Sequence, residues 1–129
     1  MLHSNPSHLY NLPIYKKAKE IRLLSHRISS YLNYDLSALK DDGSENQDIY
    51  LTGDIVQQSE SLAPEILKAE LNSEKKHVHA KTVEWITMRM NNTCKRLEKF
   101  SSDGRDFIPI LRSELKKFRK LQRSWMLNL

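Results

Sequence analysis

Cysteine, glycine and proline are scarce in this sequence, and each shortage excludes a class of protein. One Cys among 129 residues, Cys94, excludes an internal disulfide and any zinc or iron–sulfur site built from several cysteines. Three Gly and four Pro are too few for a collagen-like or low-complexity chain, and they disfavour an all-β fold with many tight turns. The sequence also lacks a run of about 18 apolar residues, the length that a membrane-spanning helix requires.

What remains is a chain of globular composition with a strongly charged surface. Apolar residues make up 39% and charged residues 29%, and the length suits one domain. Residues 1–11 have neither the basic start nor the apolar core of a secretory signal. Together with the single Cys, this pattern predicts a soluble cytoplasmic domain with no membrane partner.

Charge is distributed unevenly along the chain. The formal net charge is +5, a balance that permits attraction to nucleic acid but does not establish it. Residues 41–72 carry eight acidic residues and one Lys, whereas residues 105–123 carry seven basic and two acidic residues. The segments 12–40 and 73–100 are also basic. We therefore expect a protein with sides of opposite charge.

Apolar residues recur at steps of three and four, the period of an amphipathic helix. After an N-terminal extension of residues 1–11, this pattern predicts helices over residues 12–40, 45–71, 73–100 and 105–127. Their buried stripes are predicted to be Ile14, Ala18, Ile21, Ser25, Ile28 and Leu32; Ile55, Gln58, Leu62, Ile66 and Ala69; His79, Val83, Ile86, Met90, Thr93 and Leu97; and Ile108, Leu111, Leu115, Phe118, Gln122 and Trp125. We expect an all-α fold, an up-down-up-down antiparallel four-helix bundle over residues 12–129.

Several helix ends carry residues with known preferences. Pro13 and Pro109 are expected in first turns, where the missing N–H costs nothing. Residues 44–47 have the spacing of a capping box, and residues 72–73 offer a cap for the third helix. Pro64 lies inside the second predicted helix and removes one backbone hydrogen bond, which predicts a kink there.

No motif in the sequence argues for an enzyme, a cofactor or a metal site. His77 and His79 form an H-x-H pair, but side chains two residues apart on a helix do not face each other. Cys94 has no evident His partner, and we interpret it as a small buried apolar residue. The carboxylates of the second helix lack the Glu-x-x-His motif of a di-iron bundle, and we interpret them as a solvated acidic face. These carboxylates are Glu60, Glu65 and Glu70.

The strongest functional signal is a row of basic residues on the fourth predicted helix. Its spacing of i, i+4, i+7, i+8 and i+11 places the side chains along one side of the helix, over about 16 Å. The row consists of Arg112, Lys116, Arg119, Lys120 and Arg123, and we expect it to be continued from the third helix by Lys95, Arg96 and Lys99. Such a row suits the phosphate backbone of RNA or DNA.

Aromatic residues do not interleave this row, so we expect recognition by backbone and shape rather than by base stacking. The alternative interpretation is a solvated face whose cations pair with acids of the second helix or of a neighbouring subunit.

Three segments resemble a family of small bacterial four-helix-bundle proteins. They are Leu12-Pro13-Ile14-Tyr15-Lys16-Lys17-Ala18, Leu62-Ala63-Pro64-Glu65-Ile66, and Leu111-Arg112-Ser113-Glu114-Leu115 with Phe118, Arg119 and Trp125. The family includes proteins encoded in intervening sequences of large-subunit ribosomal RNA genes. It also includes the accessory variability determinant (Avd) proteins of diversity-generating retroelements. The chain departs from the usual pattern after Ile66, because residues 68–70 contain no glycine.

The resemblance implies a ring-like homo-oligomer, commonly a pentamer, that has no active site of its own. In the retroelement branch, the basic ring binds nucleic acid and the element's reverse transcriptase and supports cDNA synthesis. Residues and resemblance together predict a non-enzymatic, nucleic-acid-binding accessory protein of a reverse transcriptase. The alternative is a protein–protein adaptor whose acidic second helix docks on the basic helices of a neighbouring copy.

Overall fold

The computed structural model describes residues 6–36, 41–44, 49–99 and 106–129. A short 3-10 helix, η1 (Pro6–Asn11), precedes four long helices: α1 (Pro13–Leu36), α2 (Tyr50–Leu71), α3 (Lys76–Leu97) and α4 (Ile108–Leu127). These described ranges contain no strand, and the all-α prediction is confirmed.

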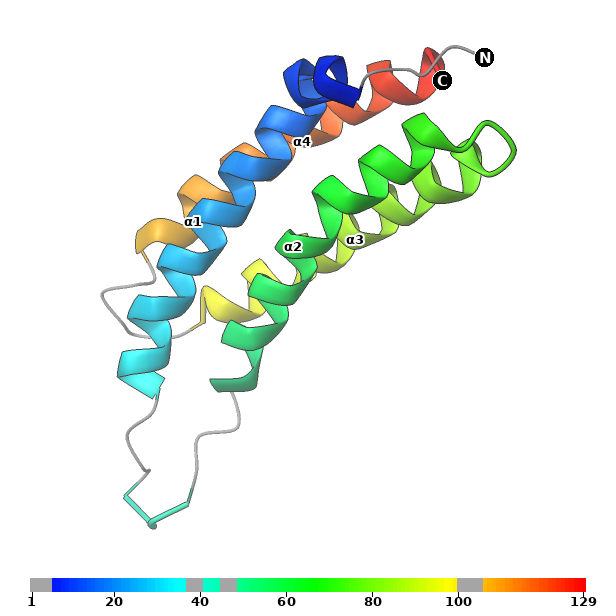
Figure 1. Ribbon diagram of the computed structural model, residues 1–129. Helices are drawn as coiled ribbons and strands as arrows, with labels where there is room; N and C mark the ends of the chain where they lie inside the picture. The colour runs from blue at the N-terminus through cyan, green and yellow to red at the C-terminus, as the bar shows by residue number, and fades with distance from the viewer. Residues whose placement is uncertain (1–5, 37–40, 45–48, 100–105) are drawn as a thin grey trace.

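The long helices form a four-helix bundle in which each helix packs against two neighbours (Figure 1). α2 lies between α1 and α3, and α4 closes the bundle by contacting α3 and α1. The first turns of α1 and α3 and the last turns of α2 and α4 lie at the same end of the bundle (Figure 1). The segment η1 packs against α1, and its Leu9 is buried, so part of the predicted extension belongs to the folded domain.

The core consists of the apolar stripes that the sequence predicts. Every predicted stripe residue of α1 and α4 is buried. The stripes of α2 and α3 differ only at Gln58 and His79, which are half-buried. Because each helix turns one stripe towards the bundle axis, its charged residues are left on the flanks and on the outer surface.

Prolines occupy the predicted positions. Pro13 is the first residue of α1, Pro109 is the second residue of α4, and Pro64 lies inside α2. Of the predicted capping box at 44–47, only Ser44 lies within the described residues, and its backbone N–H and hydroxyl both donate to the carboxylate of Asp42. The predicted helix ends at 40, 45, 100 and 105 likewise fall outside the described residues.

The third helix begins later than predicted, at Lys76 instead of residue 73. The side-chain oxygen of Asn72 accepts hydrogen bonds from the backbone N–H groups of Glu74 and Lys75, each at 3.1 Å. These bonds hold the short connection in a turn, and Asn72 thus caps the turn that precedes α3.

Replacing Leu115 tests the predicted core. Its side chain is 1% exposed at the centre of the α4 stripe, so Leu115→Ala should lower the free energy of unfolding by about 2–5 kcal/mol. Leu127→Ala is the control, because Leu127 is 87% exposed on the same helix and its loss should change stability by less than about 0.5 kcal/mol. Urea denaturation followed by circular dichroism measures both, and equal midpoints would contradict the assignment of the core.

Candidate functional site

The burial of one stripe on α4 leaves two flanks, one towards α1 and one towards α3. The acidic residue of this helix, Glu114, lies on the α1 flank, where it binds Lys17. Arg112, Lys116 and Arg119 lie on the α3 flank, where they line a groove between the two helices. Glu114, with Lys117 beside it, is therefore on the other flank from Arg112, Lys116 and Arg119.

The groove between α3 and α4 has a volume of about 800 Å³. Its lining consists of Asn91 and Glu98 from α3 and of Pro109, Arg112, Ser113, Leu115, Lys116 and Arg119 from α4. Arg123 lies one turn beyond Arg119, and Lys120 one turn beyond Lys116, so the row continues along the helix past the groove. The structure thus brings the five predicted cations of α4 onto adjoining parts of one surface.

Arg112 differs from the other members of the row because it already has a partner. Its Nη1 atom donates to both carboxylate oxygens of Glu98, at 2.9 and 3.1 Å, and both side chains are about one-third exposed. This ion pair joins α3 to α4. Arg112, predicted as one of the phosphate ligands, thus lies on the expected surface with its guanidinium paired to the acid in the groove.

The remaining members of the row are exposed: Lys116, Arg119, Lys120 and Arg123. None of these four side chains forms an ion pair with another residue in the described part of the chain. We call this set the α4 basic face. Its two arginines and two lysines leave their full charge available to a polyanion.

Of the three cations predicted to continue the row, Lys95 and Lys99 lie next to this surface. Lys95 lies four residues after Asn91 and three before Glu98, which places it on the groove side of α3. Lys99 lies in the turn that follows Leu97, the last residue of α3. Both are exposed and have no ion-pair partner among the described residues. Glu84, two turns before Asn91, is an exposed acid on the same side.

Arg96 does not continue the α4 basic face. It lies seven residues after Arg89, which lines a second groove between α2 and α3. Because seven residues are nearly two helical turns, Arg96 and Arg89 share the side of α3 that faces α2. Neighbours in sequence, Lys95 and Arg96, are thus placed on different sides of the helix.

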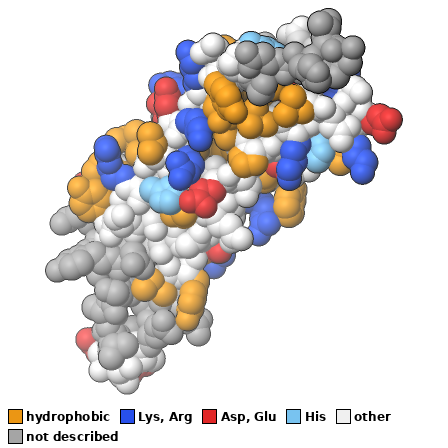
Figure 2. All heavy atoms as spheres, viewed as in Figure 1, with side chains coloured by type: hydrophobic (Ala, Val, Ile, Leu, Met, Phe, Trp, Pro, Cys, Tyr) orange, Lys and Arg blue, Asp and Glu red, His pale blue; other side chains and the backbone are white. Residues whose placement is uncertain are grey.

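Basic residues on α1 and α2 have a different arrangement. On the face of these two helices that Figure 2 shows, Lys and Arg side chains are spread among acidic and hydrophobic side chains.

Most acidic residues of α2 have hydrogen-bond or ion-pair partners within the chain. Glu60 contacts His26 at 2.7 Å, Glu65 contacts His79 and Lys68, and Glu70 accepts a hydrogen bond from the Trp125 ring nitrogen.

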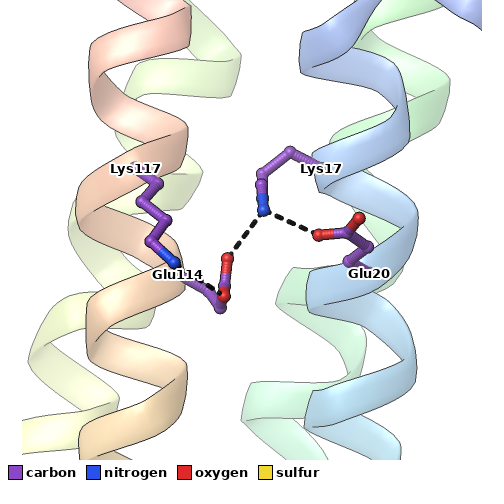
Figure 3. A network of polar contacts seen from close by, with 4 residues as sticks. All are labelled: Lys17, Glu20, Glu114 and Lys117. Carbon is purple, nitrogen blue, oxygen red and sulfur yellow. Dashed lines mark hydrogen bonds and ion pairs between the residues drawn. The ribbon is translucent and has the colours of Figure 1, made fainter.

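A network of four charged residues fixes α4 to α1 (Figure 3). Lys17 donates to Glu114 at 2.8 Å and to Glu20 at 2.7 Å, while Lys117 donates to Glu114 at 3.3 Å. The hydrogen bond from Lys17 lowers the pKa of Glu114, and the bond to Glu114 raises the pKa of Lys17. The network therefore favours the charged forms of both groups across the α1–α4 contact.

The geometry gives little support to a reactive cysteine or to a histidine metal site. Burial, followed by the nearby charge of Glu98, raises the pKa of the Cys94 thiol to about 12, so this sulfur is protonated at neutral pH. His77 is exposed, whereas His79 is half-buried against Glu65. Within the residues that the structure describes, no group of three or more His, Cys, Asp or Glu could hold a metal ion.

Trp85 is the functional candidate that sequence reasoning missed. The spacing predicts a place beside the buried stripe of α3, but the side chain is 56% exposed and lines the α2–α3 groove. Arg89 holds its guanidinium carbon 4.6 Å from the ring centroid. The i, i+4 spacing of an aromatic residue and an arginine was the available signal.

Comparisons with known protein families, with characterised proteins and with solved structures found no match to this chain. Among the described helices, none combines the length and the apolar character needed to cross a lipid bilayer.

The Glu114 network predicts a pH-dependent contribution to stability. The pKa of Glu114 is lower in the folded chain than its ordinary value of 4.5, so its contribution is present above pH 4.5 and is lost as the pH falls further. Glu114→Gln should lower the free energy of unfolding at neutral pH by up to about 1 kcal/mol, because the pair is partly solvated. The difference from the wild type should disappear in acid, as measured by urea denaturation. Glu84→Gln is the control, and a Glu114→Gln difference that is independent of pH would contradict the assignment.

Cys94 should not react while the protein is folded. Its sulfur is buried and its pKa is raised, so iodoacetamide at about pH 8 should label it only after unfolding in guanidinium chloride. Mass spectrometry measures the extent of labelling. Rapid modification of the native protein would contradict the burial of Cys94 in the α3–α4 part of the core.

Proposed function

We propose that the protein is a non-enzymatic accessory factor that binds the phosphate backbone of RNA or DNA through the α4 basic face. The observation that supports this proposal most is the set of four exposed cations on α4 without carboxylate partners in the described chain. Lys95 and Lys99 extend the positive surface across the groove. Because these charged side chains are already close together on one helix, they attract a polyanion without a prior conformational change.

The spacing of the cations suits a nucleic-acid strand. Lys116 and Arg123 lie seven residues apart, about 10 Å along the helix axis. Successive phosphates on one strand of a duplex are separated by about 3.4 Å along its axis, so the face spans several of them. Binding would release condensed counterions and would therefore weaken as salt is added.

The partner protein follows from the resemblance and not from the geometry. Likeness to the Avd family suggests that the protein supports the reverse transcriptase of a diversity-generating retroelement as a cytoplasmic homo-oligomer, commonly a pentamer.

For the bundle itself, we propose an up-down-up-down antiparallel order of helices and a kink at Pro64. The shared end at which α1 and α3 begin and α2 and α4 end supports that order (Figure 1).

The alternative, a self-assembling adaptor, receives less support. It requires the acids of α2 to be free for the basic helices of a second copy. Glu60, Glu65 and Glu70 instead have partners on α1, α3 and α4 of their own chain. We therefore prefer an external polyanion as the ligand of the basic face.

Charge reversal on α4 tests the proposal. Replacing Lys116, Arg119 and Arg123 by Glu should lower the affinity for a single-stranded oligonucleotide at least about tenfold, because three phosphate contacts are lost. The slope of log K against log salt between about 50 and 200 mM should fall in magnitude by about 2. Fluorescence anisotropy measures both quantities.

The control variant replaces Lys16, Lys19 and Arg27 by Glu, which changes the net charge equally but on α1. These three side chains are exposed, so both variants should keep wild-type helicity. The control should bind more tightly than the α4 variant. Equal loss in the two variants would mean that only net charge matters, and unchanged binding by the α4 variant would reject the face.

A further inference from the structure

The exposed Trp85 is unusual because a large aromatic side chain is ordinarily buried or hydrogen-bonded at a surface. Its ring lines the α2–α3 groove and has the Arg89 guanidinium over it, with 4.6 Å between the guanidinium carbon and the ring centroid. Indole rings and guanidinium groups are both surfaces on which unpaired nucleobases stack.

The groove next to Trp85 has the size and the polar groups of a small-ligand site. Its volume is about 440 Å³, and its lining is Asp54, Gln57, Gln58, Ser61, Glu65, Thr82, Trp85, Ile86 and Arg89. The amide of Gln57 and the carboxylate of Asp54 have no hydrogen bond or ion pair to another described residue. These groups offer both donors and acceptors to the edge of a base.

One of the two carboxylates that line this groove is already compensated. Glu65 contacts His79 at 2.8 Å and Lys68 at 3.2 Å. Burial by itself would raise the pKa of Glu65, but the hydrogen bonds and charges of these two residues together lower it. Asp54 is the one carboxylate in the lining that lacks such a partner.

Cations flank Trp85 along α3. Lys81 precedes it by four residues, Arg89 follows by four, and Arg96 follows by eleven. This spacing puts the three cations along the same outer part of the helix as the indole. All three are exposed and have no ion pair within the described residues, so they are available to the phosphates on either side of a bound base.

We propose that the α2–α3 groove binds one unpaired base of a nucleic-acid strand, stacked against Trp85 and Arg89, with flanking phosphates on Lys81 and Arg96. This inference rests on the proposed function and deepens it, because it makes the preferred ligand single-stranded. A duplex cannot use the site, since the faces of its bases are covered by their neighbours. Base stacking on α3 thus adds to the backbone contacts of α4.

The experiment compares two single strands of equal charge. One is an oligodeoxyadenylate of about 16 nucleotides, and the other is an abasic deoxyribose strand with the same number of phosphates. Trp85→Ala should weaken binding of the oligodeoxyadenylate at least about fivefold and leave the abasic strand unaffected, because only stacking is lost. Binding of a duplex of the same length should be equally insensitive to this change.

Two further variants make the result specific. Trp85→Phe should restore much of the lost affinity, since it keeps an aromatic face. Val78→Ala should behave as the wild type, because Val78 is exposed on the same side of α3 but carries no ring. Tryptophan fluorescence should be quenched by the oligodeoxyadenylate and not by the abasic strand, and this quenching should vanish in Trp85→Phe.

The failures of the two proposals are distinguishable. If Trp85→Ala binds the oligodeoxyadenylate as tightly as the wild type, or if it weakens both strands equally, the stacking site is rejected while the α4 basic face stands. If the wild-type protein binds neither strand at low salt, the proposed function is rejected and the stacking site with it.

Discussion

The burial of one stripe on α4 is the constraint on which the rest of the site depends. Ile108, Leu111, Leu115 and Phe118 lie on one side of the helix with almost no exposure, and this fixes the rotation of the helix about its own axis. Once that rotation is fixed, the 100° step between residues decides which flank each charged side chain occupies. The cations of the α4 basic face lie towards α3 and solvent because the core requires the opposite side.

Two ion pairs complete the positioning of α4. Lys17 and Glu114 join its α1 flank, and Arg112 and Glu98 join its α3 flank. Partly exposed pairs of this kind contribute little stability by themselves, but each one fixes a contact between two helices. Arg112 also neutralises the carboxylate that would otherwise repel phosphate from the groove. Under the proposed function, a residue that the row's spacing suggests as a ligand therefore acts by removing this repulsion.

The sequence alone was sufficient for the helices and for the core, because burial follows a period that is visible in one dimension. All six predicted stripe residues of α4 are buried, and Pro13 and Pro109 lie in the first turns of α1 and α4, as the sequence predicts. Sequence also placed Lys116, Arg119 and Arg123 on one side of a helix, since that is a matter of spacing within one element.

Contacts between helices cannot be predicted from the spacing of residues within one helix. Arg112 and Glu98 belong to different helices, and no spacing within either helix indicates that they meet. Lys95 and Arg96 are adjacent in the sequence, and the positions of α2 and α4 around α3 decide which helix each of them lies towards. The exposure of Trp85 depends on how far α2 covers α3 at that level, which the spacing of residues within α3 does not indicate.

Lysine footprinting tests the central claim most directly, because it asks where on the folded protein a polyanion lies. The protein would be acetylated briefly with and without a saturating single-stranded oligonucleotide, and the modification of each lysine would be read by mass spectrometry. The account predicts that the strand protects Lys116 and Lys120 on α4, while Lys16 and Lys19 on α1 stay as reactive as in the free protein. Equal protection on the two helices, or protection confined to α1, would contradict it.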